Sequence, residues 1–321
     1  MPVKVAINGF GRIGQLACKR ILDKHHNLEV VAVNDLEKEK VLKNSFANDS
    51  VYGVYKKKVE ASFFREKDPA KLPWKKLGVA LVLESTGFFT DKQGATKHLK
   101  AGARKVIISA SSKSKGVPIY ILGVNEKNSN LKKNNVVAMG SCTTNAVCPV
   151  AMILDKKFGI KKGFLNTVHS YTVAQNKLYK NWQKMPSANL SIIPATTGAT
   201  KTVERCLPQL KGKLNGLALR VPTATVSIVE LAMILKKPAS AKTINQVLKK
   251  ASESKALEGI LKVENKQIVS ANLRGNSFSS IVDSNLTQSF GNFVRVFIWY
   301  DNEYGYACRL AEFASLIAKT L

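Results

Sequence analysis

The chain has 321 residues, 45% of them apolar, and a formal net charge of +28 at neutral pH. This length predicts two domains, with enough apolar residues to form two cores. No apolar run approaches the roughly 20 residues that cross a bilayer, and the N-terminus lacks the charged and apolar regions of a secretory signal. We therefore expect a globular, cytoplasmic protein that has no membrane partner.

The positive charge raises the possibility of a nucleic-acid partner. The lysines, however, are scattered in groups of three or fewer, such as Lys56–Lys58, and no block of five or six like charges occurs. We interpret them as a solvated surface that favours anionic small molecules, and we do not expect nucleic acid as the main partner. The five cysteines lack the spacing of a disulfide framework, so we expect reduced thiols.

The first part of the chain alternates short apolar runs with helical patterns. Strands are predicted at 3–7, 28–35, 79–85, 104–109 and 117–122. Apolar residues recur at helical spacing after residue 12 and again over 91–100. This alternation predicts an α/β fold, a doubly wound parallel sheet of the Rossmann type.

The texture changes after residue 160. Longer strand-like segments at 216–231 and 292–300 predict an α+β domain with a mainly antiparallel sheet. We place the first domain at 1–141 and the second at 142–303. The final segment, 304–321, has a helical apolar stripe and is expected to pack back on the first domain.

A glycine motif follows the first predicted strand. Gly9, Gly11 and Gly14 form G-x-G-x-x-G at the start of a predicted helix, and Asp35 ends the next strand about 20 residues later. Such glycines let the backbone approach a pyrophosphate, whose charge suits a helix N-terminus. A carboxylate at Asp35 accepts hydrogen bonds from the ribose hydroxyls and repels a 2′-phosphate. This favours NAD over NADP.

Cys142 is the cysteine with the most reactive context. Its spacing from Cys148 fits neither a zinc site nor a C-x-x-C redox pair, and we expect no bound metal. Cys142 precedes a predicted helix, where the helix dipole and unpaired N–H groups favour a thiolate and can stabilise an oxyanion. We expect the remaining cysteines to be packing residues: Cys18, Cys148, Cys206 and Cys308.

A nucleophilic thiol needs a base, and the chain has four histidines. His25 and His26 form a polar pair after the first helix. His98 is predicted on a helix surface among lysines. His169 follows a strand-like segment and is the candidate base that would shuttle protons for Cys142.

Ten successive motifs resemble those of the phosphorylating glyceraldehyde-3-phosphate dehydrogenases. In chain order they are INGFGRIG, VNDL, ESTGFFT, AGARKVIISA, GVNE, SCTTN, HSYT, IIPATTGATK, GKLNGLALRVPT and WYDNEYGY. The resemblance covers almost the whole chain. It implies NAD-dependent oxidation of glyceraldehyde 3-phosphate with inorganic phosphate, in a homotetramer, with Cys142 as nucleophile and His169 as base.

The resemblance also implies binding residues. Those expected at the substrate and phosphate sites are Ser141, Thr143, Thr172, Thr197, Gly198 and Arg220. Those expected to contact NAD are Asn8, Gly9, Gly11, Arg12, Ile13, Gly14, Asp35, Lys67, Thr86, Gly87, Ser109 and Asn302.

Several positions depart from the family pattern. Phe88 and Lys67 stand where arginine is usual, and Met139-Gly140 replaces Asn-Ala. The loop over 173–191 is shorter and lacks an arginine cluster, which bears on the tetramer and on the strictness of NAD preference. Two alternatives stay open: an erythrose-4-phosphate dehydrogenase, and a moonlighting nucleic-acid-binding protein on this fold.

Overall fold

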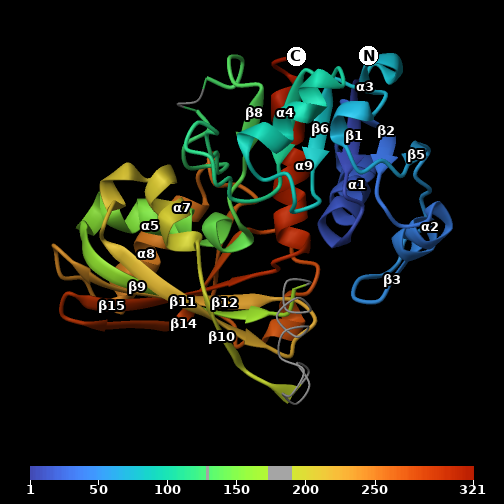
Figure 1. Cartoon of the computed structure of the whole chain (residues 1–321). Helices are drawn as coiled ribbons and strands as arrows, with labels where there is room; N and C mark the ends of the chain where they lie inside the picture. The colour runs from blue at the N-terminus through green and yellow to red at the C-terminus, as the bar shows by residue number, and fades with distance from the viewer. Residues whose placement is uncertain (128–129, 173–189) are drawn as a thin grey trace. The chain divides into compact units, whose positions relative to one another are not determined.

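The computed structural model describes residues 1–127, 130–172 and 190–321 (Figure 1). The chain divides into two compact units. The first unit contains Met1–Ser141 and Tyr306–Leu321, and the second contains Cys142–Gly305. No helix in these described ranges is long and apolar enough to cross a membrane.

The first unit is built on a sheet of six parallel strands in the order β5-β2-β1-β6-β7-β8. The strands are β1 (Val3–Asn8), β2 (Leu28–Asn34), β5 (Ser62–Phe64), β6 (Leu81–Glu84), β7 (Lys105–Ile108) and β8 (Val136–Ala138). The central strands are buried on both faces, which explains their continuous apolar runs. The predicted parallel sheet of the Rossmann type is confirmed.

Helices and a small hairpin complete the first unit. They are α1 (Arg12–Lys24), α2 (Glu39–Ala47), the hairpin β3 (Asn48–Asp49) and β4 (Gly53–Val54), the short helices η1 (Pro69–Lys71) and α3 (Trp74–Leu77), α4 (Lys92–Lys100) and most of α9 (Tyr304–Ala318). In α9, the Phe313 ring lies 6.1 Å from that of Tyr120, and Ser315 donates a 2.9 Å hydrogen bond to Asn27. The C-terminal helix is thereby fastened to the parallel-sheet unit.

One predicted strand is wrong. Residues 117–122 form only an isolated bridge, between Ile119 and Ala138, and the sixth strand is β8 instead. Pro118 lacks the N–H that a central strand must donate. The apolar run is nevertheless buried, with Val117 and Ile121 at 0% and 1% exposed. Its apolar residues therefore indicated burial and not a strand.

The predicted surface position of His98 is also wrong. His98 is completely buried on α4, where its imidazole lies between Trp74 and Glu84. The neighbouring lysines in the sequence face outward while His98 occupies the inward side of the same helix, because residues one apart point in different directions.

The second unit has a seven-stranded sheet in the order β10-β11-β9-β12-β15-β14-β13. Its strands are β9 (Ile160–Ser170), β10 (Ile193–Thr196), β11 (Leu214–Val221), β12 (Ser227–Leu235), β13 (Leu261–Glu264), β14 (Ser280–Phe290) and β15 (Phe293–Tyr300). Four of the pairings are antiparallel and two are parallel, which confirms the mainly antiparallel prediction.

Helices cover one face of this sheet (Figure 1). They are α5 (Cys142–Phe158), α7 (Ala199–Cys206) and α8 (Ala241–Ser252). Two short helices lie in connections: η3 (Pro208–Leu210) between α7 and β11, and η4 (Ser270–Leu273) between β13 and β14. Strand residues alternate accordingly: on β9, Leu165, Thr167 and His169 are buried, while Phe164 and Val168 are exposed. The sheet thus has one core face and one open, largely apolar face.

Candidate active site

Cys142 and His169 lie together in the second unit. The Cys142 sulfur is 3.4 Å from Nε2 of His169. Cys142 is partly exposed and begins α5, as predicted, whereas His169 is 4% exposed near the end of β9. The thiol and the imidazole are within proton-transfer reach.

Strand pairing brings Arg220 to the same place. β11 runs parallel to β9 with Arg220 opposite His169. Nη1 of Arg220 lies 2.6 Å from Nδ1 of His169 and 3.3 Å from the Ser170 carbonyl, while that carbonyl is 2.8 Å from Nδ1. One guanidinium and one carbonyl therefore compete for the same imidazole nitrogen.

The expectation of a resting thiolate does not agree with the electrostatics. Burial raises the pKa of the Cys142 thiol, against smaller lowering effects from the Arg220 charge and from hydrogen bonds of Thr143. Burial, followed by the Arg220 charge, lowers the pKa of His169 to about 3. Desolvation outweighs the helix terminus here, so the described pair is a neutral thiol beside a neutral imidazole.

Thr143 hydrogen-bonds the Cys142 sulfur. The Thr143 hydroxyl lies 2.9 Å from the Tyr300 hydroxyl. The Tyr300 hydroxyl also lies 2.9 Å from the Thr167 hydroxyl. Thr143 is 4% exposed. Sequence reasoning overlooked Tyr300, although its place in the WYDNEYGY motif was a usable signal.

The other residues expected to bind phosphate lie on two elements. Thr197 and Gly198 form the N-terminus of α7, where the Thr197 hydroxyl accepts the Ala199 N–H at 3.2 Å. Thr172 follows β9 and is half-buried. Among the described residues, the buried Nε of Arg220 has no hydrogen-bond partner, which leaves a charged donor available to an anion.

Asn302 is held by two hydroxyls that the sequence did not single out. Its Oδ1 accepts from Ser170 Oγ and Ser227 Oγ, each at 2.9 Å. Only its NH₂ group remains to face a ligand. Ser227 follows Val226, whose φ of +71° is strained for a β-branched residue and marks a tightly constrained backbone here.

The glycine turn of the first unit has the geometry that a pyrophosphate requires. Gly9 has φ +90°, and a Cβ there would lie 2.5 Å from the Thr86 nitrogen. A Cβ at Gly14 would lie 2.1 Å from the Gly9 carbonyl oxygen, whereas one at Gly11 would meet nothing within 4 Å. Gly11 is the N-cap of α1 and makes no side-chain hydrogen bond. The N–H groups of the first turn of α1 therefore face open space, in which a phosphate group can bind.

Most residues expected to contact NAD lie at the carboxyl ends of parallel strands. Asn8 ends β1, Thr86 and Gly87 follow β6, and Ser109 follows β7. Asp35 follows β2, and its carboxylate accepts the Phe10 N–H at 2.6 Å. This is the sheet edge at which nucleotides bind in open α/β folds, and the residues present fit NAD.

Three expected cofactor residues, Arg12, Ile13 and Lys67, lie outside the ends of the parallel strands. Arg12 pairs with the buried Asp49 at 2.8 Å, and its guanidinium carbon lies 5.5 Å from the Tyr52 ring centroid. Its side chain is therefore anchored inward, and the adjacent Ile13 is half-buried in the first turn of α1. Lys67 lies beyond β5 with an exposed side chain.

The Met139-Gly140 departure has a local explanation. Gly140 has φ +69°, a left-handed conformation that favours glycine, and Met139 is completely buried. The residues of the shortened loop, 173–189, lie outside the described part of the chain, so the expectations placed on that loop stay predictions.

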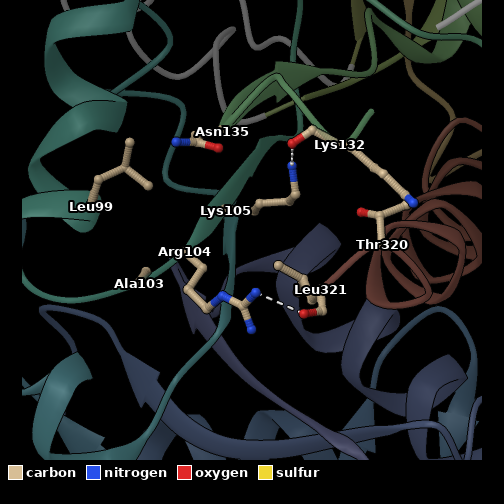
Figure 2. Close-up of a pocket in the computed structure, with 8 residues that line it drawn as sticks. All are labelled: Leu99, Ala103, Arg104, Lys105, Lys132, Asn135, Thr320 and Leu321. Atoms are coloured by element: carbon tan, nitrogen blue, oxygen red, sulfur yellow. Dashed lines mark hydrogen bonds between the residues drawn. The ribbon is translucent and has the colours of Figure 1, made fainter. Parts of the chain in front are cut away.

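A pocket of the first unit lies at the amino ends of the parallel strands, near the start of β7 (Figure 2). Its buried Lys105 donates to the carbonyls of Leu131, Lys132 and Asn134 at 2.6, 3.1 and 3.0 Å. Arg104 donates to the Leu321 carbonyl at 2.7 Å. All three ammonium hydrogens of Lys105 are thus used to hold the chain, not a ligand.

In the described ranges no group of three or more His, Cys, Asp or Glu residues is arranged to hold a metal.

Comparison with known proteins connects both units to one family. Residues 3–92 match the family model for the NAD-binding domain of glyceraldehyde 3-phosphate dehydrogenase, and residues 141–302 match that for its C-terminal domain. Glyceraldehyde-3-phosphate dehydrogenase 1 of Bacillus subtilis is 45% identical, with 99% of each chain covered. The Podospora anserina enzyme is 44% identical over 99% of this chain and 98% of its own. Chloroplastic glyceraldehyde-3-phosphate dehydrogenase B of Pisum sativum is 43% identical over 98% of this chain and 74% of its own.

These matches establish an oxidoreductase of glycolysis that converts glyceraldehyde 3-phosphate with NAD. The chain belongs to the glyceraldehyde-3-phosphate dehydrogenase family.

Proposed function

We propose that this enzyme oxidises D-glyceraldehyde 3-phosphate to 1,3-bisphosphoglycerate through a thioester on Cys142, with His169 as the base. The observation that carries the proposal is the 3.4 Å separation of the Cys142 sulfur from Nε2 of His169 at the start of α5. A thiol and an imidazole at this distance form an activated nucleophile when the proton passes between them.

In the first step the sulfur attacks the aldehyde carbon, and His169 receives the thiol proton. The carbonyl oxygen, placed at the N–H groups of the α5 start, takes that proton from His169, which gives a thiohemiacetal and a neutral imidazole. His169 then assists removal of the hydroxyl proton as the C–H bond breaks. Bound NAD supplies the acceptor for the hydride, and the carbon becomes a thioester.

In the second step inorganic phosphate attacks the thioester carbon, and the Cys142 thiolate leaves and regains from His169 the proton that His169 took from the hydroxyl. We assign the attacking phosphate to Ser141, Thr143, Thr197 and Gly198, supported by the N-terminus of α7. We assign the substrate's own phosphate to Thr172 and Arg220. The support is the buried Nε of Arg220, which has no hydrogen-bond partner among the described residues and could donate to a phosphate oxygen.

The same contacts suggest how substrate binding activates the base. Because arginine only donates, Nδ1 of His169 accepts from Arg220 at 2.6 Å, and Nε2 then carries the hydrogen and faces the thiol as a donor. A phosphate on Arg220 competes for that guanidinium. Nδ1 can then carry the hydrogen to the Ser170 carbonyl, 2.8 Å away, and Nε2 becomes a base.

This switch predicts an effect of a phosphate ester that lacks the aldehyde. Glycerol 3-phosphate should shift the pH profile of Cys142 alkylation by iodoacetamide to lower pH in the wild type, and not in Arg220→Gln. An equal shift in both proteins would show that Arg220 does not control the imidazole.

The cofactor residues divide between the two units. In the first unit we assign the pyrophosphate to Gly9, Gly11 and the start of α1, and the adenosine ribose to Asp35. The other proposed contacts there are Asn8, Arg12, Ile13, Gly14, Lys67, Thr86, Gly87 and Ser109. In the second unit, Asn302 presents its NH₂ group, a donor suited to the nicotinamide amide.

We also propose a homotetramer. The open face of the seven-stranded sheet exposes large apolar side chains, including Phe164 at 60% and Phe293 at 46% exposed, with Val168, Leu217 and Ile234 nearby on paired strands. Such a face suits burial against a second copy of the chain. A cytoplasmic location stays a prediction.

The test is NADH formation from glyceraldehyde 3-phosphate, NAD and inorganic phosphate by the wild type and by Cys142→Ser. We expect activity in the wild type, about a thousandfold or greater loss in the variant, and weaker activity with erythrose 4-phosphate. Higher kcat/KM for erythrose 4-phosphate would support the alternative dehydrogenase. Absence of activity together with tight, salt-sensitive RNA binding would support the nucleic-acid alternative.

A further inference from the structure

A buried hydrogen-bond network centred on Glu84 lies beside the glycine turn. Glu84 ends β6 and is 2% exposed. Its Oε2 accepts from Asn8 Nδ2 at 2.6 Å and lies 3.0 Å from His98 Nε2. Its Oε1 accepts from the Thr86 N–H at 2.8 Å and from the Thr86 hydroxyl.

Trp74 fixes the role of the histidine in this network. The Trp74 indole nitrogen lies 3.0 Å from Nδ1 of His98. An indole N–H can only donate, so Nδ1 accepts, and Nε2 carries the hydrogen that His98 donates to Glu84. A neutral His98 completes the set of four donors, and a carboxylate is the form of Glu84 that accepts all of them.

The network connects two turns that meet at the cofactor edge. Asn8 precedes Gly9, and its Oδ1 accepts from Asn34 Nδ2 at 2.7 Å. The Gly9 turn contacts the Thr86 turn so closely that a Cβ on Gly9 would reach the Thr86 nitrogen. Glu84 bonds to both turns and thereby holds them in one arrangement.

Glu84 also determines the polarity of Thr86. The Thr86 hydroxyl gives its hydrogen to Glu84, and its oxygen accepts the Phe88 N–H at 3.1 Å. Toward a ligand this oxygen can act only as an acceptor. It suits a ribose hydroxyl or an amide N–H of the cofactor, and it repels a phosphate oxygen.

We propose that Glu84 is a positioning residue of the NAD site, which holds the Asn8 and Thr86 turns together and presents Thr86 to the dinucleotide as a hydrogen-bond acceptor. Trp74 and His98 support it by supplying a donor without a positive charge. The inference rests on the NAD-site assignment proposed above, and nothing in the reaction at Cys142 requires it.

The experiment measures NAD binding by calorimetry to the full chain. In Glu84→Gln one acceptor oxygen becomes an NH₂ group that faces other donors, so we expect the NAD dissociation constant to rise about tenfold or more. Glu29→Gln, which removes an exposed carboxylate from β2, is the matched control and should bind like the wild type. Cys142 alkylation without NAD should be unchanged in both variants.

A double-mutant cycle separates positioning from a general loss of structure. If Glu84 acts through Thr86, then Glu84→Gln adds little to the loss caused by Thr86→Val, and Thr86→Ser restores binding to within about threefold of the wild type. Should Glu84→Gln fail to fold, Trp74→Phe removes the indole donor to His98, together with part of a completely buried ring, and should also weaken NAD binding severalfold.

The possible failures are distinguishable. Wild-type affinity in Glu84→Gln, or in Trp74→Phe where that variant stands in for it, overturns this inference and leaves the NAD-site assignment intact. Fully additive losses in the cycle also overturn it. Absence of NAD binding by the wild type overturns the NAD-site assignment itself, and the inference with it.

Discussion

At the scale of single residues, the site is governed by desolvation. The sequence suggested a thiolate at Cys142 because the residue begins a helix, and the helix start is indeed there. Burial nevertheless favours the neutral forms of both Cys142 and His169. A neutral pair at rest agrees with the proposal that the proton transfer occurs within the catalytic cycle, after the substrate has bound.

The low pKa of His169 predicts an acid-sensitive contribution to stability. Its pKa is about 3 in the folded chain and 6.5 as an unperturbed group. Between these values the unfolded chain binds a proton that the folded chain excludes, so stability is lost as pH falls from 6.5 toward 3. The slope attributable to His169 is at most about 1.4 kcal/mol per pH unit.

Urea unfolding at several pH values checks this. The free energy of unfolding of His169→Asn should fall less steeply than that of the wild type across this window. His26→Asn, on a histidine outside the site, is the control and should follow the wild type. Parallel curves for wild type and His169→Asn would contradict the assignment.

At the scale of elements, the β1–α1 turn assigns different roles to its glycines. Gly14 is required for packing against Gly9, whereas Gly11 has normal φ of −77° and open space. We expect Gly14→Ala to destabilise the fold by roughly 1–3 kcal/mol. Gly11→Ala should leave stability near that of the wild type and weaken NAD binding by roughly tenfold, about 1.4 kcal/mol.

Thermal unfolding and NAD titration of the two variants distinguish these roles. Equal losses of stability in both variants would show that Gly11 is also a packing residue. Unchanged NAD affinity in Gly11→Ala would show that the dinucleotide does not approach the backbone there.

Much of each element could be predicted from local pattern, and the pairing between elements could not. The glycine turn, the helix start at Cys142 and the candidate His169 were all recognisable from nearby residues. Arg220 meets His169 only because β9 and β11 pair in one register across 51 positions. Gly216 permits that pairing, since a Cβ there would lie 1.8 Å from the Leu165 carbonyl oxygen.

Buried polar residues were the other source of error. His98 sits among lysines in sequence and was predicted on the surface, yet it is completely buried because Trp74 and Glu84 satisfy both ring nitrogens. Tyr300 is buried in the same way, because its hydroxyl has hydroxyl partners on helix α5, at Thr143, and on strand β9, at Thr167. Sequence alone does not reveal whether a polar group finds such partners.

At the scale of the whole molecule, the prediction concerns assembly. The open sheet face of the second unit carries exposed apolar residues on adjacent strands, and Leu217 is 43% exposed near Phe164 and Val168. We expect the wild type to be a homotetramer. Leu217→Glu should shift it toward smaller species, because a charge buried in an apolar interface is costly.

Sedimentation velocity measures this directly. Leu36→Glu, on an exposed apolar residue of the first unit, is the matched control and should leave the assembly unchanged. A tetramer that persists in Leu217→Glu would place the interface elsewhere, and a monomeric wild type would overturn the homotetramer proposal.

The covalent role of Cys142 is the central claim, and trapping the acyl-enzyme tests it most directly. The enzyme is incubated with glyceraldehyde 3-phosphate and NAD without inorganic phosphate, and peptides are analysed by mass spectrometry. The account predicts a phosphoglyceryl group on the peptide containing Cys142, which disappears when phosphate is added and does not form in Cys142→Ser. NADH formation with no acylation of Cys142, or with acylation of another residue, would contradict it.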